Sequence, residues 1–146
     1  MLARRELSTA QLSDRLRRKG FTDEKIELAI QRLLHEGALD DRRAAVTYAY
    51  RAAHVKMRGR LRTIRDLHRI RINREVAQAA IDEVYDALDE EAMLEQALAK
   101  RLRGHVENRA TFHRLYQYLM RQGFDGSMAI AALNAKATPT AKPDDN

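Results

Sequence analysis

The sequence contains no cysteine and no tryptophan, and its two prolines, Pro139 and Pro143, lie near the C-terminus. Without cysteine the chain can form neither disulfides nor thiolate metal sites, which suits a reducing compartment and predicts a cytoplasmic protein. Three phenylalanines and five tyrosines supply all the aromatic bulk, so a core must rely on Leu, Ile and Ala, a composition that favours helices. Because no proline interrupts residues 1–138, we predict an all-α fold.

Long apolar runs are also absent from the sequence. The N-terminal segment "MLARRELSTAQL" lacks the apolar run of a secretory signal, and no segment has the length and apolarity of a membrane span. We therefore expect a soluble monomer without a membrane partner. A chain of 146 residues can bury one modest core or several very small ones.

Motifs for catalysis and cofactor binding are missing as well. None of the five histidines belongs to an HExxH arrangement, no serine lies in a nucleophile elbow, and the six glycines form no phosphate-binding loop. The acidic run "DEVYDALDEEAMLEQ" (82–96) spreads over a helix end, a cap and the first turn of the next helix. We interpret these acids as capping and solvent-facing residues rather than cation ligands. The sequence therefore predicts a non-enzymatic protein with no catalytic residue, metal or cofactor.

Charge is distributed unevenly along the chain. Residues 1–71 contain 18 Lys+Arg against 9 Asp+Glu, whereas residues 72–146 contain 9 against 12. The window 51–71 holds 8 basic residues and 1 acid, and the window 82–95 holds 7 acids and no basic residue. A basic first half predicts a polyanionic partner, or a partner whose own charges alternate.

A pattern recurs three times along the chain. Each copy has a leucine, an apolar anchor five residues later, and an alanine followed by a branched aliphatic residue eight and nine residues after the anchor. The copies are "LRRKGFTDEKIELAI" (16–30), "LHRIRINREVAQAAI" (67–81) and "LMRQGFDGSMAIAAL" (119–133), with anchors 51 and 52 residues apart. Gly20 and Gly123 suit a left-handed helix end, and Arg71 takes the equivalent position in the second copy at some strain. Thr22, Asn73 and Asp125 are predicted to cap the helices that follow. Each copy is therefore predicted to be a helical hairpin.

Further helical segments lie between the hairpins, from about 41 to 57 and from about 89 to 103. We predict an elongated tandem array of three-helix repeats, with an incomplete first repeat at 1–39, a second at 40–88, a third at 89–137 and a disordered tail at 138–146. Ser8 and Gln11 are predicted to form a capping box for the first hairpin helix. Only seven residues precede Ser8, so either the start of the first repeat is shortened or this repeat has two helices.

The stretch "RGRLRTIRDLHRIRI" (58–72) holds six arginines and one acid, Asp66. On a helix, Leu61, Ile64 and Leu67 would form one apolar stripe, with arginines on a neighbouring face. Such a face can simply be the solvent-exposed side of an ordinary helix. The density of unpaired charge instead favours contact with phosphates or with an acidic protein surface. The residues predicted to face a partner are Arg17, Arg18, Arg51, Arg58, Arg60, Arg62, Arg65, Arg69 and Arg71.

Several of these features occur together in one protein family. In order, the chain reads "LARRELSTAQLSDRLRRKGF", "LLHEGALDDRRAAVTYAYR" and "RGRLRTIRDLHRIRI", followed in the third repeat by "LAKRLRG" and "YLMRQGF". This succession resembles the RecX regulators of the bacterial recombinase RecA over residues 2 to 135 or so. The sequence departs from the family pattern at Ala44, where phenylalanine is usual, at Leu61, where a Gly-Pro pair is common, and at Arg71, which replaces the turn glycine.

The resemblance implies a non-enzymatic modulator that lodges in the groove of the RecA–ATP–single-stranded DNA filament. Such a protein spans neighbouring protomers and restrains ATP hydrolysis, filament growth and strand exchange in recombination, DNA repair and the SOS response. Some members also contact DNA. Two alternatives remain open from the residues themselves: a basic helical-repeat protein that binds nucleic acid without a recombinase partner, and an interaction scaffold whose charge serves only solubility.

Overall fold

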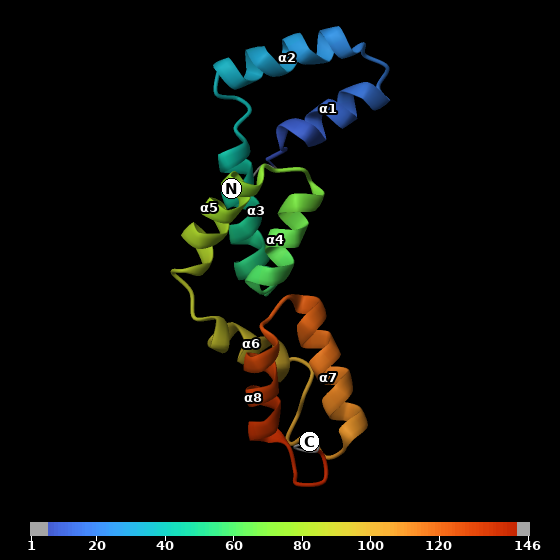
Figure 1. The fold of residues 1–146 in the computed structure, drawn as a ribbon, viewed down its shortest axis with the longest axis vertical. Coiled ribbons are helices and arrows are strands. Elements are labelled where there is room, and N and C mark those ends of the chain that lie inside the picture. The colour runs from blue at the N-terminus through green and yellow to red at the C-terminus, as the bar shows by residue number, and fades with distance from the viewer. Residues whose placement is uncertain (1–5, 143–146) are drawn as a thin grey trace.

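The computed structural model describes residues 6–142, and over these residues the chain is helical, which confirms the all-α prediction (Figure 1). The described part contains the helices α1 (Thr9–Arg18), α2 (Asp23–His35), α3 (Asp41–His54), α4 (Arg60–Arg69), α5 (Arg74–Tyr85), α6 (Glu90–Ala99), α7 (Arg109–Gln122) and α8 (Gly126–Lys136). They stack into an elongated molecule, in which α1–α2, α3–α5 and α6–α8 follow one another along the long axis (Figure 1). We call these groups the first, second and third repeats.

The same turn closes the hairpin of each repeat. The backbone N–H of the apolar anchor donates to the carbonyl oxygen of the leucine five residues earlier. The N···O distances are 3.2 Å for Phe21 and Leu16, 3.1 Å for Ile72 and Leu67, and 3.2 Å for Phe124 and Leu119. The repeated sequence pattern therefore corresponds to a repeated backbone hydrogen bond of the kind that ends helices at a left-handed residue.

The residue before each anchor has a positive φ, at +96° for Gly20, +58° for Arg71 and +94° for Gly123. Arg71 thus occupies the left-handed region that was predicted for it, where a side chain costs more than it does in glycine. The predicted caps are also present, because side-chain oxygens of Thr22, Asn73 and Asp125 accept backbone N–H groups of α2, α5 and α8. Ser8 and Gln11 form the predicted capping box at the start of α1.

The three anchors differ in burial. Ile72 and Phe124 are 3% and 1% exposed, whereas Phe21 is 49% exposed. The shared position in the repeated pattern therefore does not give the three anchors the same burial. In the described part of the chain the first repeat consists of α1 and α2 alone, so no third helix covers this ring. The sequence pattern thus predicted the turn, whereas the burial of the anchor depends on which helices pack around it.

The hydrophobic core is divided between two regions. One core runs without interruption through the second and third repeats and includes Leu67, Tyr85 and Phe124. A separate small core in the first repeat consists of Ile26, Ile30 and Leu39, with Leu12, Leu16 and Leu33 packed against it. The second and third repeats are therefore joined through apolar packing, and the first repeat is stabilised by its own smaller core.

Polar contacts connect the first repeat to the second. The Ser8 hydroxyl donates to the Ile70 carbonyl oxygen at 3.0 Å, and the Thr9 N–H donates to Asp41 Oδ1 at 2.6 Å. Arg43 forms an ion pair with Glu6 at 3.1 Å. Because exposed charges are screened by salt, we infer that this junction is more sensitive to ionic strength than the one between the second and third repeats.

Several segments differ from the sequence-based expectations. Residues 138–142 do not form the start of a disordered tail, since the Thr138 N–H donates to the Val106 carbonyl oxygen at 2.9 Å and Ala141 is fully buried. The remainder of that tail, 143–146, lies outside the described residues, as do residues 1–5 of the predicted first repeat. Leu61 is 49% exposed and so does not join the predicted apolar stripe, because the buried face of α4 is formed by Thr63, Asp66 and Leu67. No helix within residues 6–142 has the length and apolar character needed to cross a membrane.

Tyr85 links α5 to the segment that precedes α4. Its side chain is fully buried, its hydroxyl donates to the Arg58 carbonyl oxygen at 2.7 Å, and the same hydroxyl lies 2.7 Å from Thr63 Oγ1. Burial raises the pKa of Tyr85 to about 12. The hydroxyl is therefore protonated at neutral pH and is available as the donor for this buried network.

The raised pKa of Tyr85 predicts a stability change at alkaline pH. Above pH of about 10 the unfolded tyrosine loses its proton while the folded one keeps it, so the free energy of unfolding should fall by roughly 1.4 kcal/mol per pH unit up to about pH 12. Urea unfolding at several pH values, compared with Tyr85→Phe, isolates this contribution because the other titrating groups are common to both proteins. Equal slopes for the two proteins would contradict the assignment.

Candidate interaction surface between the second and third repeats

The arginines of the 58–72 stretch do not share one environment. Arg58 exposes 18% of its side chain and forms an ion pair with Asp66, with Nη1 3.1 Å from Oδ2. The Asp66 side chain is 10% exposed, and Arg62 and Arg69 approach it to 3.9 Å each. Arg58 was predicted to face a partner. The ion pair with the buried Asp66 leaves only a small part of the Arg58 side chain accessible to a partner.

Arg60 is also held within the protein. Its guanidinium lies 2.7 Å from Glu90 and 2.9 Å from Asp86, and its Cζ is 5.8 Å from the centroid of the Tyr85 ring. A hydrogen bond from Arg60 to Asp86 and further contact with Glu90 raise the pKa of Arg60 above its usual value. The acidic run after α5 therefore neutralises this arginine, and Arg60 does not belong to a free basic surface.

The N-terminus of α4 meets the C-terminus of α7. The Gly59 N–H donates to the Gln122 carbonyl oxygen at 2.8 Å, and the Leu61 N–H donates to the Gly123 carbonyl oxygen at 3.2 Å. Helices leave their first N–H groups and last carbonyl groups without partners of their own. Here the unpaired donors of one helix satisfy the unpaired acceptors of the other, with the positive end of one dipole against the negative end of the next. This contact fixes the third repeat against the second.

Arg62 reinforces the same junction with its side chain. Nη1 donates to the Arg121 carbonyl oxygen at 3.2 Å and to Gln122 Oε1 at 2.7 Å. A guanidinium at the C-terminus of a helix is favourable because it faces the negative end of the dipole. Arg62, which was predicted to face a partner, is therefore mainly a junction residue, with 30% of its side chain exposed at the edge of the interface.

Arg71 connects the second repeat back to the first. Its Nη2 donates to the Asp14 carboxylate and to the Ala10 carbonyl oxygen, the latter at 3.2 Å. The Arg71 guanidinium holds the pKa of the Asp14 carboxyl below its usual value. The departure from glycine at this turn thus supplies an ion pair between repeats, which offsets part of the cost of a positive φ.

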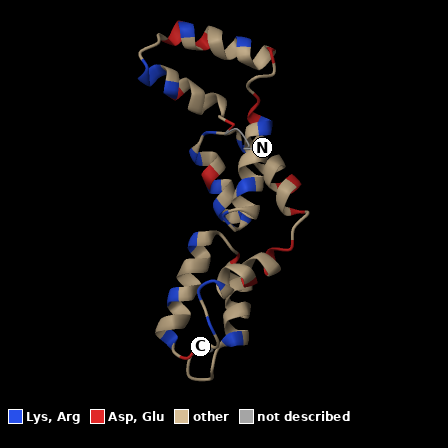
Figure 2. Ribbon diagram, turned by 180° about the vertical axis from the view of Figure 1, so that it is seen from behind, with Lys and Arg blue, Asp and Glu red and all other residues tan. Residues whose placement is uncertain are grey.

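The remaining predicted arginines are exposed. Arg69 exposes 80% of its side chain, and the side chain of Arg65 donates to the Leu61 carbonyl oxygen of its own helix at 3.3 Å. Arg17 is 56% exposed and pairs loosely with Asp14 and Asp23, while Arg18 and Arg51 are also exposed. For all nine predicted arginines the partner-facing role stays a prediction, and these five have exposed side chains. Figure 2 shows Lys and Arg along the edge formed by α1, α4 and α7, and Asp and Glu toward the opposite edge around the end of α5.

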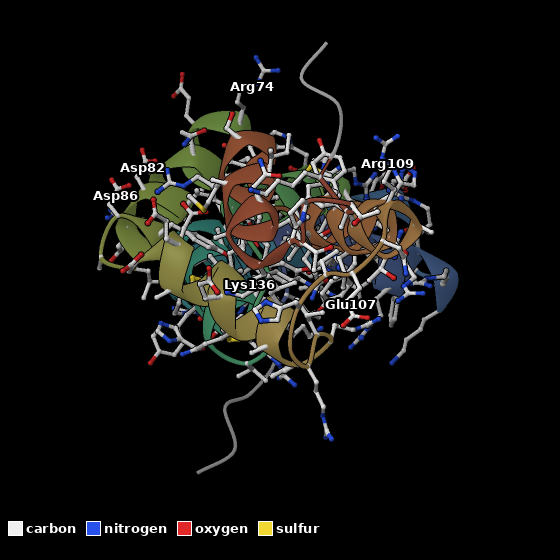
Figure 3. The ribbon with its side chains drawn as sticks, turned by 90° about the horizontal axis from the view of Figure 1, so that it is seen from below. Arg74, Asp82, Asp86, Glu107, Arg109 and Lys136 are labelled. Atoms are coloured by element: carbon white, nitrogen blue, oxygen red, sulfur yellow. The ribbon has the colours of Figure 1, made fainter. Side chains whose placement is uncertain are left out.

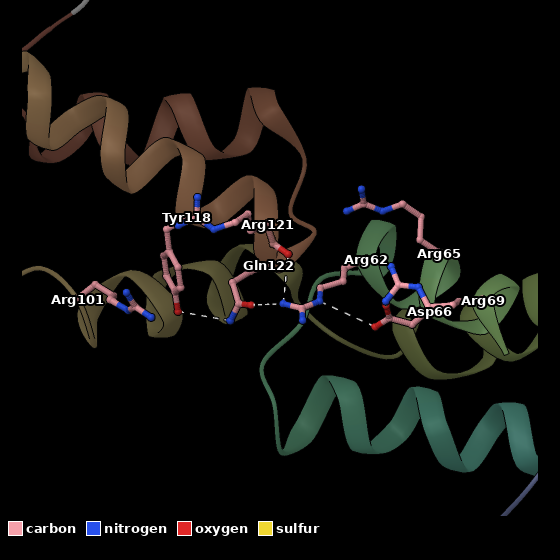
Figure 4. Close-up of a pocket in the computed structure, with 8 residues that line it drawn as sticks. All are labelled: Arg62, Arg65, Asp66, Arg69, Arg101, Tyr118, Arg121 and Gln122. Atoms are coloured by element: carbon pink, nitrogen blue, oxygen red, sulfur yellow. Dashed lines mark hydrogen bonds and ion pairs between the residues drawn. The ribbon is translucent and has the colours of Figure 1, made fainter.

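A cleft of 470 Å³ lies where the second and third repeats meet (Figure 4). It is lined by Arg62, Arg65, Asp66, Arg69, Arg101, Tyr118, Arg121 and Gln122. Arg101, Tyr118, Arg121 and Gln122 were not among the residues predicted to face a partner. Their sequence signal was present in "LAKRLRG" and "YLMRQGF", but it became informative only once α7 was placed beside α4.

A chain of contacts organises the floor of this cleft. The Cζ atom of Arg101 lies 4.1 Å from the centroid of the Tyr118 ring. Gln122 Nε2 donates to the Tyr118 hydroxyl at 3.4 Å, and its other side-chain atom, Oε1, accepts from Arg62. These contacts join the segment after α6 to α7 and α4. They hold the guanidinium groups of Arg62 and Arg101 in position, and such preorganisation lowers the cost of binding an anion.

The cleft carries uncompensated positive charge. Asp66 is its single acid, and that carboxylate is already shared among Arg58, Arg62 and Arg69. Within residues 6–142, no acidic side chain pairs with Arg65, Arg101 or Arg121. The same residues contain no group of three or more His, Cys, Asp or Glu that could hold a metal ion. The arrangement suits an anionic partner.

Known proteins with similar sequences share one description. A family model described as "RecX, first three-helix domain" matches residues 1–33. The Regulatory protein RecX of Thermotoga maritima is 32% identical over 124 residues, covering 85% of this chain and 72% of that protein. The Regulatory protein RecX of Syntrophotalea carbinolica is 30% identical over 130 residues, covering 85% and 83%, and that of Amycolatopsis mediterranei is 30% identical over 135 residues, covering 91% and 77%.

Proposed function

Because the chain belongs to the RecX family of regulatory proteins, we propose that it binds the filament formed by RecA, ATP and single-stranded DNA and inhibits it without chemistry of its own. In this proposal the protein restrains RecA ATP hydrolysis, filament growth and strand exchange during recombination and DNA repair in the cytoplasm. The family assignment and the basic edge of an elongated molecule are the observations that support it (Figure 2).

The shape of the molecule suits a helical filament. Stacked repeats present a long surface instead of an enclosed pocket, and such a surface can contact more than one protomer of a polymer. The basic edge formed by α1, α4 and α7 would face the filament, with Arg65, Arg69, Arg17 and Arg18 as contact residues. Charged residues at the rim of an interface chiefly steer encounter and set specificity, so inhibition should weaken as ionic strength rises.

The exposed arginines of α4 and the arginines that stabilise the fold are different residues, so the exposed ones can be substituted by themselves. We expect Arg65→Glu combined with Arg69→Glu to raise the concentration needed for half-maximal inhibition of RecA ATPase by about tenfold or more, since each reversal replaces attraction by repulsion. Arg58 and Arg62 are left intact because they stabilise the fold and the repeat junction. The readout is ATP hydrolysis by RecA on single-stranded DNA across a titration of this protein.

A matched control changes the same charge elsewhere. Lys25 and Arg74 are exposed residues at the starts of α2 and α5, outside the cleft. Lys25→Glu combined with Arg74→Glu should inhibit like the wild type, and helicity by circular dichroism should be unchanged in both variants. If the two double variants inhibit equally well, α4 is not the docking surface. If the wild-type protein neither inhibits RecA nor sediments with preformed filaments, the proposed function is wrong.

A further inference from the structure

We propose that the cleft between the second and third repeats is a binding site for phosphate-ester groups, with Arg65, Arg101 and Arg121 as its phosphate-contacting residues. The three guanidinium groups come from α4, from the segment after α6 and from the last turn of α7. This site goes beyond the inhibition of RecA, because it requires no protein partner and depends on two arginines of the third repeat.

The charge of the cleft supports an anion as its ligand. Guanidinium groups that line one cleft without acidic partners repel each other, and anionic groups bound among them remove that repulsion while accepting charge-assisted hydrogen bonds. Within the described residues the three arginines have no acidic partner, whereas Asp66 is occupied by other arginines at distances from 3.1 to 3.9 Å. The cleft therefore lacks an internal counterion for these three side chains.

The lining favours phosphate over an acidic polypeptide. Seven of the eight lining residues have charged or polar side chains. The eighth, Tyr118, carries a polar hydroxyl, and its ring lies against the Arg101 guanidinium. Sites that bind peptides and proteins usually supply an apolar centre with a polar rim, and this cleft has no aliphatic side chain in its lining. Guanidinium groups, by contrast, match the geometry of phosphate oxygens by donating pairs of parallel hydrogen bonds.

Contacts made by Arg101 and by the Arg121 backbone place these two residues at the cleft. The Arg101 guanidinium lies over the Tyr118 ring. The Arg121 backbone carbonyl oxygen accepts a hydrogen bond from Arg62, and the Arg121 side chain is exposed beside the cleft (Figure 4). A phosphate bound here would contact α4 and α7 at once. Occupancy would therefore strengthen the same repeat junction that the Gly59 and Leu61 backbone bonds establish.

The phosphate can come from two sources, the backbone of a nucleic-acid strand or a free nucleotide. The test uses the full-length protein without RecA, so that its outcome is separate from the proposed inhibition. Binding of a fluorescein-labelled 20-residue oligothymidylate is followed by anisotropy over a range of salt concentrations. Unlabelled oligothymidylate, duplex DNA, ATP and inorganic phosphate are then added as competitors. Displacement by ATP or phosphate at low concentration assigns the site to free phosphate compounds, and displacement only by oligonucleotide assigns it to a strand.

The variant Arg101→Gln with Arg121→Gln keeps a polar, unbranched side chain at both positions and removes two charges. We expect the slope of log affinity against log salt to become shallower by about 1.4, at roughly 0.7 per phosphate contact with a single strand. The control Lys25→Gln with Arg74→Gln removes the same charge outside the cleft and should change that slope much less. Equal slopes for the two variants would overturn the proposal.

A measurement on the wild-type protein covers the case in which the variant fails to fold. Titration with inorganic phosphate should shift the arginine Nε–Hε NMR signals of Arg65, Arg101 and Arg121 and leave that of Arg74 in place. Uniform small shifts, or no binding of any phosphate probe, would overturn the site. Displacement of the oligonucleotide by polyglutamate at equal charge concentration would also overturn it, because the ligand would then be an acidic polypeptide.

Discussion

Replacing Gly123 with alanine should lower the free energy of unfolding by about 3 kcal/mol, from roughly 1 to 2 kcal/mol of left-handed backbone strain and the loss of up to two backbone hydrogen bonds. A Cβ at this position would lie 2.3 Å from Arg62 Cβ and 2.4 Å from the Arg62 backbone nitrogen, so the start of α4 would have to move away from α7. Such a shift breaks the bonds that Gly59 and Leu61 donate to the end of α7. Urea unfolding followed by circular dichroism measures the effect.

Two other glycines separate the causes of this loss. Gly20 has nearly the same φ, +96°, but nothing lies within 4 Å of a Cβ added there, so Gly20→Ala should show the backbone strain alone. Gly59 has an ordinary φ of −75°, yet an added Cβ would lie 2.4 Å from the Gly123 carbonyl oxygen, so Gly59→Ala should show the steric clash alone. If Gly123→Ala is no more destabilising than Gly20→Ala, the close approach of α4 and α7 does not contribute to stability.

The second large effect is expected at Asp66. Replacing Asp66 with alanine leaves the Arg58 guanidinium without its carboxylate in a position where 18% of the side chain is exposed. Removing one member of a buried ion pair costs about 3 to 5 kcal/mol because the other charge stays desolvated, and the partial exposure here places the expected loss near the lower value. Chemical denaturation of the variant and the wild type gives the difference directly.

A double substitution distinguishes a buried ion pair from simple loss of packing. Arg58→Met combined with Asp66→Leu replaces both charges with apolar groups of similar bulk, and it should recover most of the stability lost in Asp66→Ala. Asp14→Ala serves as the exposed counterpart, since it removes an ion pair to Arg71 at which both side chains are largely exposed, and its effect should be clearly smaller. If Asp66→Ala and Asp14→Ala cost the same, the Arg58–Asp66 pair is not a core interaction.

These expectations rest on contacts that the amino-acid pattern did not reveal. The arginines of 58–72 share a charge and lie close in sequence, so the sequence predicts a common role for them. Their partners are distant, however: Asp86 and Glu90 lie 26 and 30 residues after Arg60, and Asp14 lies 57 residues before Arg71. A count of charges within a window cannot register such pairs. It therefore overestimates the free positive charge on α4.

The candidate cleft was missed for a related reason. Arg101 and Arg121 occur in a part of the chain whose net charge is negative, so the distribution of charge along the sequence does not predict a basic site there. They reach the cleft because α7 ends against the start of α4, a contact that joins Arg62 to a carbonyl group 59 residues away. Gly123 was correctly assigned to a turn, but its second role, which is to allow this close approach, depends on the tertiary contact.

The sequence by itself determined the local structure and the family of this protein. Helix caps, the left-handed turns before Phe21, Ile72 and Phe124, and the 51- and 52-residue repeat follow from interactions within a few residues, which a short sequence pattern records. Only the tertiary structure decided which arginines are free. Burial, long-range ion pairs and the docking of one helix end on another depend on residues brought together by packing, and these contacts divide one basic stretch into structural and exposed side chains.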